Sequence, residues 1–210
     1  MIKVNGNDVF KDNKFDWYSW SADVFQTPAE LREAFDKLNL TGKRIVDLLA
    51  VGEALEEIGH EGVTGKEAVY IETYHLYILV FDDGDRCEIF FSETSSVRMS
   101  MNCFPKNLED IEPLPYMASG ERFISPCVGN KIIGMDIGIL DTYPYLDFTE
   151  SYGMELPDDL ESYIWYFDLL LDNGLKIRFE AAWDNGDVYI LDEYGNSYWK
   201  LDDSDREESA

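Results

Sequence analysis

Two histidines and three cysteines are the side chains best suited to nucleophilic or metal chemistry, and their spacing favours neither. No Gly-x-Ser-x-Gly motif supplies a serine nucleophile for His60 or His75. His75 lies in an apolar run, which favours a structural histidine. Cys87, Cys103 and Cys127 are an odd number at wide spacing, unlike a disulfide framework or a paired-ligand zinc site. We therefore expect reduced thiols buried in the core.

Carboxylates are the abundant reactive groups, with 43 Asp and Glu residues in 210. Two of them could act as general acid and base, as in glycoside hydrolases, but so many candidates do not single out a pair. The run Asp82-Asp83-Gly84-Asp85 offers oxygen ligands for calcium, yet its spacing is not that of an EF-hand, and a hairpin turn uses the same residues. The sequence has no P-loop and no Gly-x-Gly-x-x-Gly unit. We expect neither a metal nor a cofactor.

The charge of the chain is large and unevenly distributed. Seventeen Lys and Arg residues stand against the 43 acids, which gives a formal net charge of -26. Residues 1–44 are neutral overall, so residues 45–210 carry the whole excess. Such a charge argues against a nucleic-acid backbone or an anionic membrane as partner. Mutually repelling carboxylates favour a cationic protein partner, and solubility alone is the simpler alternative.

The segment between Lys131 and Lys176 has ten carboxylates and no basic residue, and tyrosines stand among the acids. Tyrosines beside carboxylates are typical of protein-binding surfaces, because the rings give rigid contact area and the acids attract basic groups. The alternative is that the rings pack beneath a long loop. We predict that a basic partner is bound by Asp141, Tyr143, Tyr145, Asp147, Glu150, Asp158 and Asp159.

The elements that must position these residues are one helix and many strands. Thr27-Pro28-Ala29-Glu30 has the pattern of a capping box with proline at the first helical position, and it predicts a helix over 27–39. Asp-Asn-Gly or Asp-Asp-Gly turns predict three hairpins, at 81–84, 171–174 and 183–186. With a further turn at 194–196, residues 163–201 are predicted to form a meander of about four strands.

Two short matches suggest an internal repeat. Gly42–Ile45 is similar to Gly129–Ile132, 87 residues later, and Asp82–Ile89 is similar to Asp172–Phe179, 90 residues later. Any β protein with glycine turns can give matches this short, so the duplication stays open. We predict a single domain, 1–210, with repeat lobes 40–104 and 127–201 and a frayed acidic tail, 202–210.

The predicted fold is α+β and strand-dominated: an N-terminal strand and helix, then two antiparallel, hairpin-rich lobes. The predicted function is that of a non-catalytic acidic binding protein, an inhibitor or immunity-type protein that neutralises a basic protein such as a nuclease toxin. In being small, acidic, α+β and without catalytic motifs, the chain resembles bacterial toxin-immunity proteins as a class. The alternatives are a nucleic-acid mimic that inhibits a DNA-binding enzyme, a structural or oligomerising module, and a carboxylate-based hydrolase.

The expected compartment is the cytoplasm. The first residues contain no apolar stretch of the length that a signal peptide needs, and the longest apolar runs are far shorter than a membrane span. The oligomeric state is not predicted.

Overall fold

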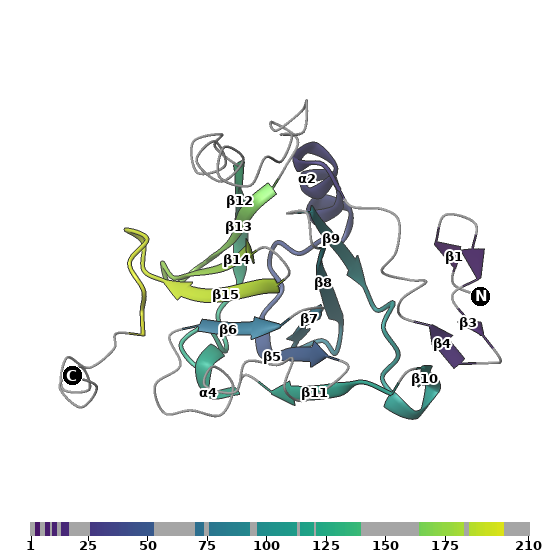
Figure 1. The fold of residues 1–210 in the computed structure, drawn as a ribbon. Helices are drawn as coiled ribbons and strands as arrows, with labels where there is room; N and C mark the ends of the chain where they lie inside the picture. Colours follow the sequence, from purple (N-terminus) through teal and green to yellow (C-terminus); the bar gives the residue numbers. More distant parts are fainter. Residues whose placement is uncertain are drawn as a thin grey trace, which may run out of the picture.

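The fold is α+β and dominated by strands, as the sequence predicts. The computed structural model describes residues 3–4, 7–8, 10–11, 14–16, 26–52, 70–73, 76–92, 96–112, 114–119, 121–139, 164–182 and 185–199. Two five-stranded antiparallel sheets make up most of this part of the chain (Figure 1).

The first sheet has the order β11-β5-β7-β8-β9, and the second has the order β12-β13-β14-β15-β6. The first contains β5 (Ile45–Gly52), β7 (Leu76–Phe81), β8 (Arg86–Ser92), β9 (Ser96–Met101) and β11 (Tyr116–Ser119). The second contains β12 (Ile132–Ile139), β13 (Ile164–Leu171), β14 (Lys176–Ala182), β15 (Asn185–Leu191) and β6 (Tyr70–Thr73). Shorter elements are β1 (Lys3–Val4), β2 (Asn7–Asp8), β3 (Phe10–Lys11), β4 (Lys14–Asp16), β10 (Ile111–Glu112) and a 3-10 turn, Leu108–Asp110.

The helix predicted over 27–39 is confirmed as α2 (Pro28–Lys37). Its capping box is formed: the Glu30 amide donates to the Thr27 hydroxyl, and the Thr27 amide donates to the Glu30 carboxylate at 2.8 Å. Leu31 and Phe35 are the buried side chains of α2. The helix lies against both β9 and β12, so it bridges the two sheets, while the short α4 (Glu121–Ile124) lies against β5.

The predicted hairpins join β7 to β8, β13 to β14 and β14 to β15. In the third, Asn185 and Gly186 lie in β15 and not in the turn. A β-carbon on Gly186 would lie 2.5 Å from the ring of Phe91, so this glycine allows close packing. After the turn at 194–196, the described residues form a single bridge, from Ser197 to Leu191. The strand beside β15 is instead β6, from a distant part of the sequence.

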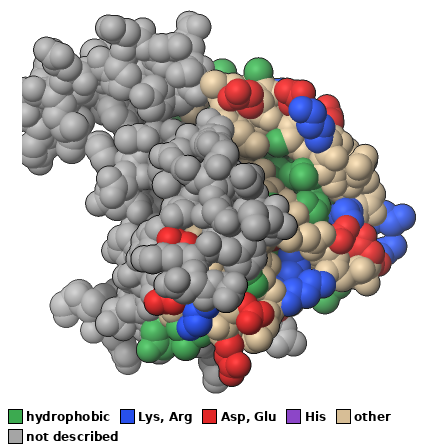
Figure 2. All heavy atoms as spheres, turned by 90° about the vertical axis from the view of Figure 1, so that its right-hand side faces the viewer, with side chains coloured by type: hydrophobic (Ala, Val, Ile, Leu, Met, Phe, Trp, Pro, Cys, Tyr) green, Lys and Arg blue, Asp and Glu red, His purple; other side chains and the backbone are tan. Residues whose placement is uncertain are grey.

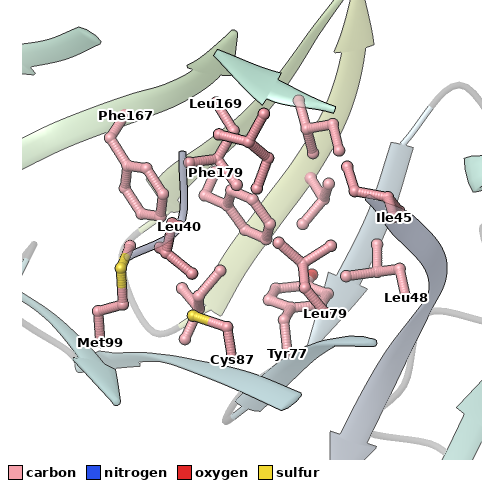
Figure 3. Packing of buried hydrophobic residues seen from close by; sticks show 14 of the residues in the cluster. Leu40, Ile45, Leu48, Tyr77, Leu79, Cys87, Met99, Phe167, Leu169 and Phe179 are labelled. Atoms are coloured by element: carbon pink, nitrogen blue, oxygen red, sulfur yellow. The ribbon is translucent and has the colours of Figure 1, made fainter. Parts of the chain in front are cut away.

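The main hydrophobic core lies between the two sheets (Figure 3). The ring of Phe167 stacks on that of Phe179 at 5.0 Å between centroids, and Tyr77 of the first sheet meets Phe179 edge-on at 5.8 Å. The buried Tyr77 hydroxyl donates to the Gly186 carbonyl at 2.5 Å, which satisfies its polar end. Cys87 and Cys127 are free and buried in this core, as expected, and burial raises the pKa of Cys127 to about 12.

Cys103, the third free cysteine, is only partly buried and packs against a separate hydrophobic cluster.

The two sheets begin in the same way. Strands β5 and β12 lead into equivalent meanders, and each has a bulge after its first residue pair: Ile45 pairs with Phe81, and Ile132 pairs with Leu171, before the register shifts. The extra residues of these bulges are exposed and apolar in both strands, Val46 and Ile133.

The starts of β5 and β12 also pair with one another in a reciprocal way. The Gly42 amide donates to the Ile132 carbonyl at 2.7 Å, and the Gly129 amide donates to the Ile45 carbonyl at 2.9 Å. Both glycines have a positive φ, 90° and 81°, which an L residue rarely adopts. The contacts obey a local two-fold symmetry that relates residues 87 positions apart.

The predicted lobes do not contain all of their sheets. Strand β6 lies within 40–104 but pairs in the second sheet, and β11 lies between the two predicted ranges but pairs in the first. An origin by duplication, like the single-domain boundary, stays a prediction.

A second hydrophobic cluster covers the outer face of the first sheet. It contains Phe15, Val51, Leu76, Ile78, Phe90, Phe104 and Ile111. The N-terminal β4 and the segment that includes β10 contribute to it, and these two strands pair in parallel.

Glu88 is fully buried on the same face of the sheet. Its carboxylate accepts hydrogen bonds from the Ser100 hydroxyl at 2.8 Å and from the Phe104 amide at 3.0 Å. Burial raises the pKa of Glu88 above its ordinary value of 4.5, and these hydrogen bonds offset the effect only in part.

This buried carboxyl predicts a pH-dependent stability. Because the folded protein holds the Glu88 proton more tightly than the unfolded chain, ionisation destabilises the fold as the pH rises above 4.5. Glu88→Gln does not ionise, and it can keep both contacts, because its amide oxygen can accept from the Phe104 amide while its NH2 group donates to the Ser100 hydroxyl. We expect the free energy of unfolding of the variant, relative to the wild type, to increase between about pH 4 and pH 7 in urea titrations.

The matched control is Glu109→Gln, which removes one exposed carboxylate. The difference in free energy of unfolding between Glu88→Gln and the wild type should change with pH. If it did not, or if it followed the same pH dependence as that of Glu109→Gln, the Glu88 carboxyl would not be desolvated.

Candidate functional site

The outer face of the second sheet carries charged and aromatic side chains. Phe167, Leu169 and Leu171 of β13 point into the main core, so the alternating residues point to the opposite face. We call this surface the acidic face and define it by Asp136, Tyr166, Asp168, Arg178, Glu180, Asp187 and Tyr189. Asp168 is buried, Asp136 is exposed, and the other five are half-buried.

The register arranges these residues in two adjacent rows across the sheet. One row runs Asp136, Asp168, Arg178, Tyr189, and the next runs Gly138, Tyr166, Glu180, Asp187. The face thus holds four carboxylates against one guanidinium. The second sheet therefore brings acids and tyrosines together. These are the residue types that the sequence analysis expects at a partner-binding surface, but they are not the residues that it names.

In the first sheet, the equivalent outer face is covered by hydrophobic side chains. Ile78 pairs with Glu88 at the positions that Asp168 and Arg178 occupy in the second sheet. In the first sheet these positions lie beneath the second hydrophobic cluster. The outer faces of the two sheets are therefore chemically opposite although their strands are equivalent.

Arg178 is the centre of the acidic face. Its Nε and Nη2 donate to the two oxygens of Asp168 at 2.8 and 3.0 Å, a bidentate pair. Its Cζ lies 3.6 Å from the centroid of the Tyr166 ring. A β-carbon on Gly138, opposite Tyr166 in the ladder, would overlap that ring, so this glycine lets the tyrosine lie flat across the edge strand.

The pair with Asp168 raises the pKa of Arg178 and fixes its side chain on Tyr166. Because both oxygens of Asp168 accept from Arg178, that carboxylate is already engaged and is poorly suited to act as a general base with Asp136.

Two more hydrogen bonds order the acidic face. The Trp165 indole donates to Glu180 at 3.2 Å, and Trp165 is the extra residue of a bulge between the pairs of Ile139 and Gly138. The Tyr189 hydroxyl donates to Asp187 at 3.1 Å. Burial raises the pKa of Glu180 above 4.5, and Arg178 and Trp165 offset this only partly.

The part of the described surface drawn in Figure 2 carries charges of both signs. Figure 2 shows the side that lies to the right in Figure 1, and among its coloured residues acidic and basic side chains lie next to one another. At the first-sheet turn, Lys43 pairs with Asp83 at 2.6 Å and with Asp85, and Arg44 lies 3.4 Å from Asp82. The three carboxylates of this hairpin turn are therefore paired with two basic side chains.

The site residues predicted from the sequence lie outside the described residues. All seven, Asp141, Tyr143, Tyr145, Asp147, Glu150, Asp158 and Asp159, fall in the range 140–163. They stay a prediction, as do the interpretations of His60 and His75, which also lie outside the described part. The sequence analysis missed the acidic face, whose signal is the single acid in the apolar run of β13 and the alternating Arg178 and Glu180 of β14.

Comparison with known proteins gives no further guide: no family model, no curated protein and no solved structure matches the chain. Among the described residues, no group of three or more His, Cys, Asp or Glu side chains is placed to hold a metal ion. No helix of the described ranges is long and apolar enough to cross a membrane.

A double-mutant cycle on Asp168 and Arg178 tests whether the acidic face is partly desolvated. We expect a coupling energy of roughly 1–3 kcal/mol in urea titrations of Asp168→Ala, Arg178→Ala and the double variant, because the pair is bidentate and its carboxylate is buried.

The reference pair is Glu33 and Lys37 on α2, at 2.6 Å but with both side chains exposed. Its coupling should be about 0.3–0.5 kcal/mol. Equal coupling in the two pairs would show that Asp168 and Arg178 behave as an ordinary surface pair.

Proposed function

We propose that the protein is a non-catalytic acidic binding protein, an inhibitor or immunity-type protein that neutralises a basic protein partner. The net charge of -26 supports a cationic partner, because it gives long-range attraction and repels other acids. A cytoplasmic location for both proteins is part of the proposal.

The observation that carries the proposal is the contrast between the two outer faces. The chain closes the outer face of the first sheet with a second hydrophobic cluster, whereas the equivalent face of the second sheet keeps four carboxylates and two tyrosines. Half-buried tyrosines and an ordered arginine supply rigid contact area, and the carboxylates give specificity for a basic partner through electrostatic complementarity.

The roles of individual residues follow from their environments. Arg178 and Tyr166 form a fixed platform, because Asp168 holds the guanidinium over the Tyr166 ring with two hydrogen bonds. Asp136 is exposed at the end of the same row and is the carboxylate best placed to meet a lysine or arginine. The partner would approach through long-range attraction and then bury the tyrosines.

Affinity capture with the tagged full chain from its native cell lysate tests this function. We expect a basic protein retained in stoichiometric amount at low salt, and more weakly at about 0.5 M salt, where charges are screened over a few Å. The activity of that protein should be inhibited in the complex. Asp136→Lys should reduce retention, and Glu109→Lys, with the same change of charge away from the acidic face, should not.

Retention of only acidic or neutral proteins, or of nothing at either salt concentration, would contradict the proposed function. Inhibition is the second requirement: a basic protein whose activity is unchanged in the complex would contradict the inhibitor role.

Reversal of the charges at 158 and 159 tests the sequence-predicted part of the contact. With the captured partner purified, Asp158→Lys with Asp159→Lys should slow association about tenfold or more at low salt, because two attractive charges become repulsive. The difference should shrink at about 0.5 M salt in stopped-flow or surface-based kinetics. An unchanged association rate would remove residues 158 and 159 from the binding surface.

A further inference from the structure

Beyond its first residue, Ile132, which bonds to residues 42 and 43, strand β12 has one edge with no partner strand in the described part of the chain. It pairs with β13, and it stands at the end of the second sheet. The equivalent strand β5 pairs on both sides, with β7 and with β11. Under the 87-residue relation, the β5 residues that β11 covers, Leu49–Gly52, correspond to Asp136–Ile139 of β12.

The exposure of the two strands agrees with this difference. The last residues of β5 are buried, Val51 and Gly52 included, whereas Asp136 is exposed and Ile139 is 49% exposed. An exposed edge strand with apolar residues is a template for another strand. Among the described residues, the strand position that β11 fills on β5 therefore has no counterpart on β12.

We propose that an extended segment of the basic partner adds to the free edge of β12 as an antiparallel strand, at the place that β11 takes on β5, with a lysine or arginine opposite Asp136. This inference rests on the proposed function and names the docking mode and the segment chemistry.

The pairing of β11 supplies the expected register. Ser119 lies opposite Leu49, and Tyr116 lies opposite Gly52. The partner residue in the place of Ser119 therefore meets Asp136, and the residue in the place of Tyr116 meets Ile139. Main-chain hydrogen bonds would supply affinity, and the side chain beside Asp136 would supply specificity. A segment with apolar residues followed by a lysine or arginine fits this edge.

Charge favours a basic segment over a second copy of this chain. Pairing of β12 with β12 of another copy would bring together two chains of net charge -26, each with an exposed Asp136 in that strand. A charge within an edge strand opposes such self-pairing and favours a complementary strand.

A peptide titration tests the docking mode on the full chain. The probe is a capped peptide of residues 114–120 that carries Ser119→Lys, and the readout is the backbone amide spectrum of the 15N-labelled protein. We expect saturable shifts centred on residues 136–139. Asp136→Lys should weaken binding of this peptide about threefold to fivefold, the size expected for one exposed ion pair.

A charge exchange provides the control. The control peptide carries Ser119→Glu in place of Ser119→Lys. Compared with the lysine peptide, it should bind the wild-type protein more weakly and the Asp136→Lys variant more tightly. Glu109→Lys should leave both affinities unchanged. Shifts that avoid β12, the absence of binding at millimolar peptide, or shifts that depend on protein concentration alone would overturn the inference, the last in favour of a second copy.

The captured partner separates this inference from the proposed function. If a basic protein binds and is inhibited while the amides of residues 136–139 do not respond to it, strand addition is wrong and the proposed function stands. If no basic protein is captured, the proposed function fails, whatever the peptide does.

Discussion

The reciprocal backbone pairing of the two leading strands is the constraint on which the rest of the structure depends. Gly42 and Gly129 each donate across to the other strand, next to an antiparallel bridge between Arg44 and Lys131. This joint lies where the two equivalent meanders begin, and their apolar faces form one core between them. Because that core uses one face of each sheet, each sheet also has an outer face. Each leading strand, β5 or β12, also has an edge that faces away from the rest of its meander.

The chain covers these surfaces unequally. On the first sheet, a second hydrophobic cluster closes the outer face and β11 covers the edge of β5. On the second sheet, the bidentate pair of Arg178 with Asp168 orders a polar outer face, and the end of β12 is exposed. Among the described residues, the first sheet thus acts as an internal reference for the outer face and the edge that are left uncovered on the second sheet.

Local signals in the sequence predicted much of the fold. The capping box at Thr27 and the Asp-Gly turns are short-range, and α2 and the hairpins follow them. The placement of β6 and β11 depended on pairing with strands far away in sequence, which no local pattern encodes. The acidic face was missed for the same reason: Asp168 and Arg178 become partners only when β13 and β14 are aligned, and a glycine opposite Tyr166 has meaning only in that register.

Hydrogen exchange of the full chain with and without its captured basic partner tests the central claim most directly, since it compares two equivalent strands in one molecule. The account predicts that, within residues 136–139 of β12, the amides that face away from β13 become protected in the complex, while those of β5, residues 45–52, keep the protection they already have. Unchanged exchange in β12, with protection appearing only outside the second sheet, would contradict a partner-binding surface there.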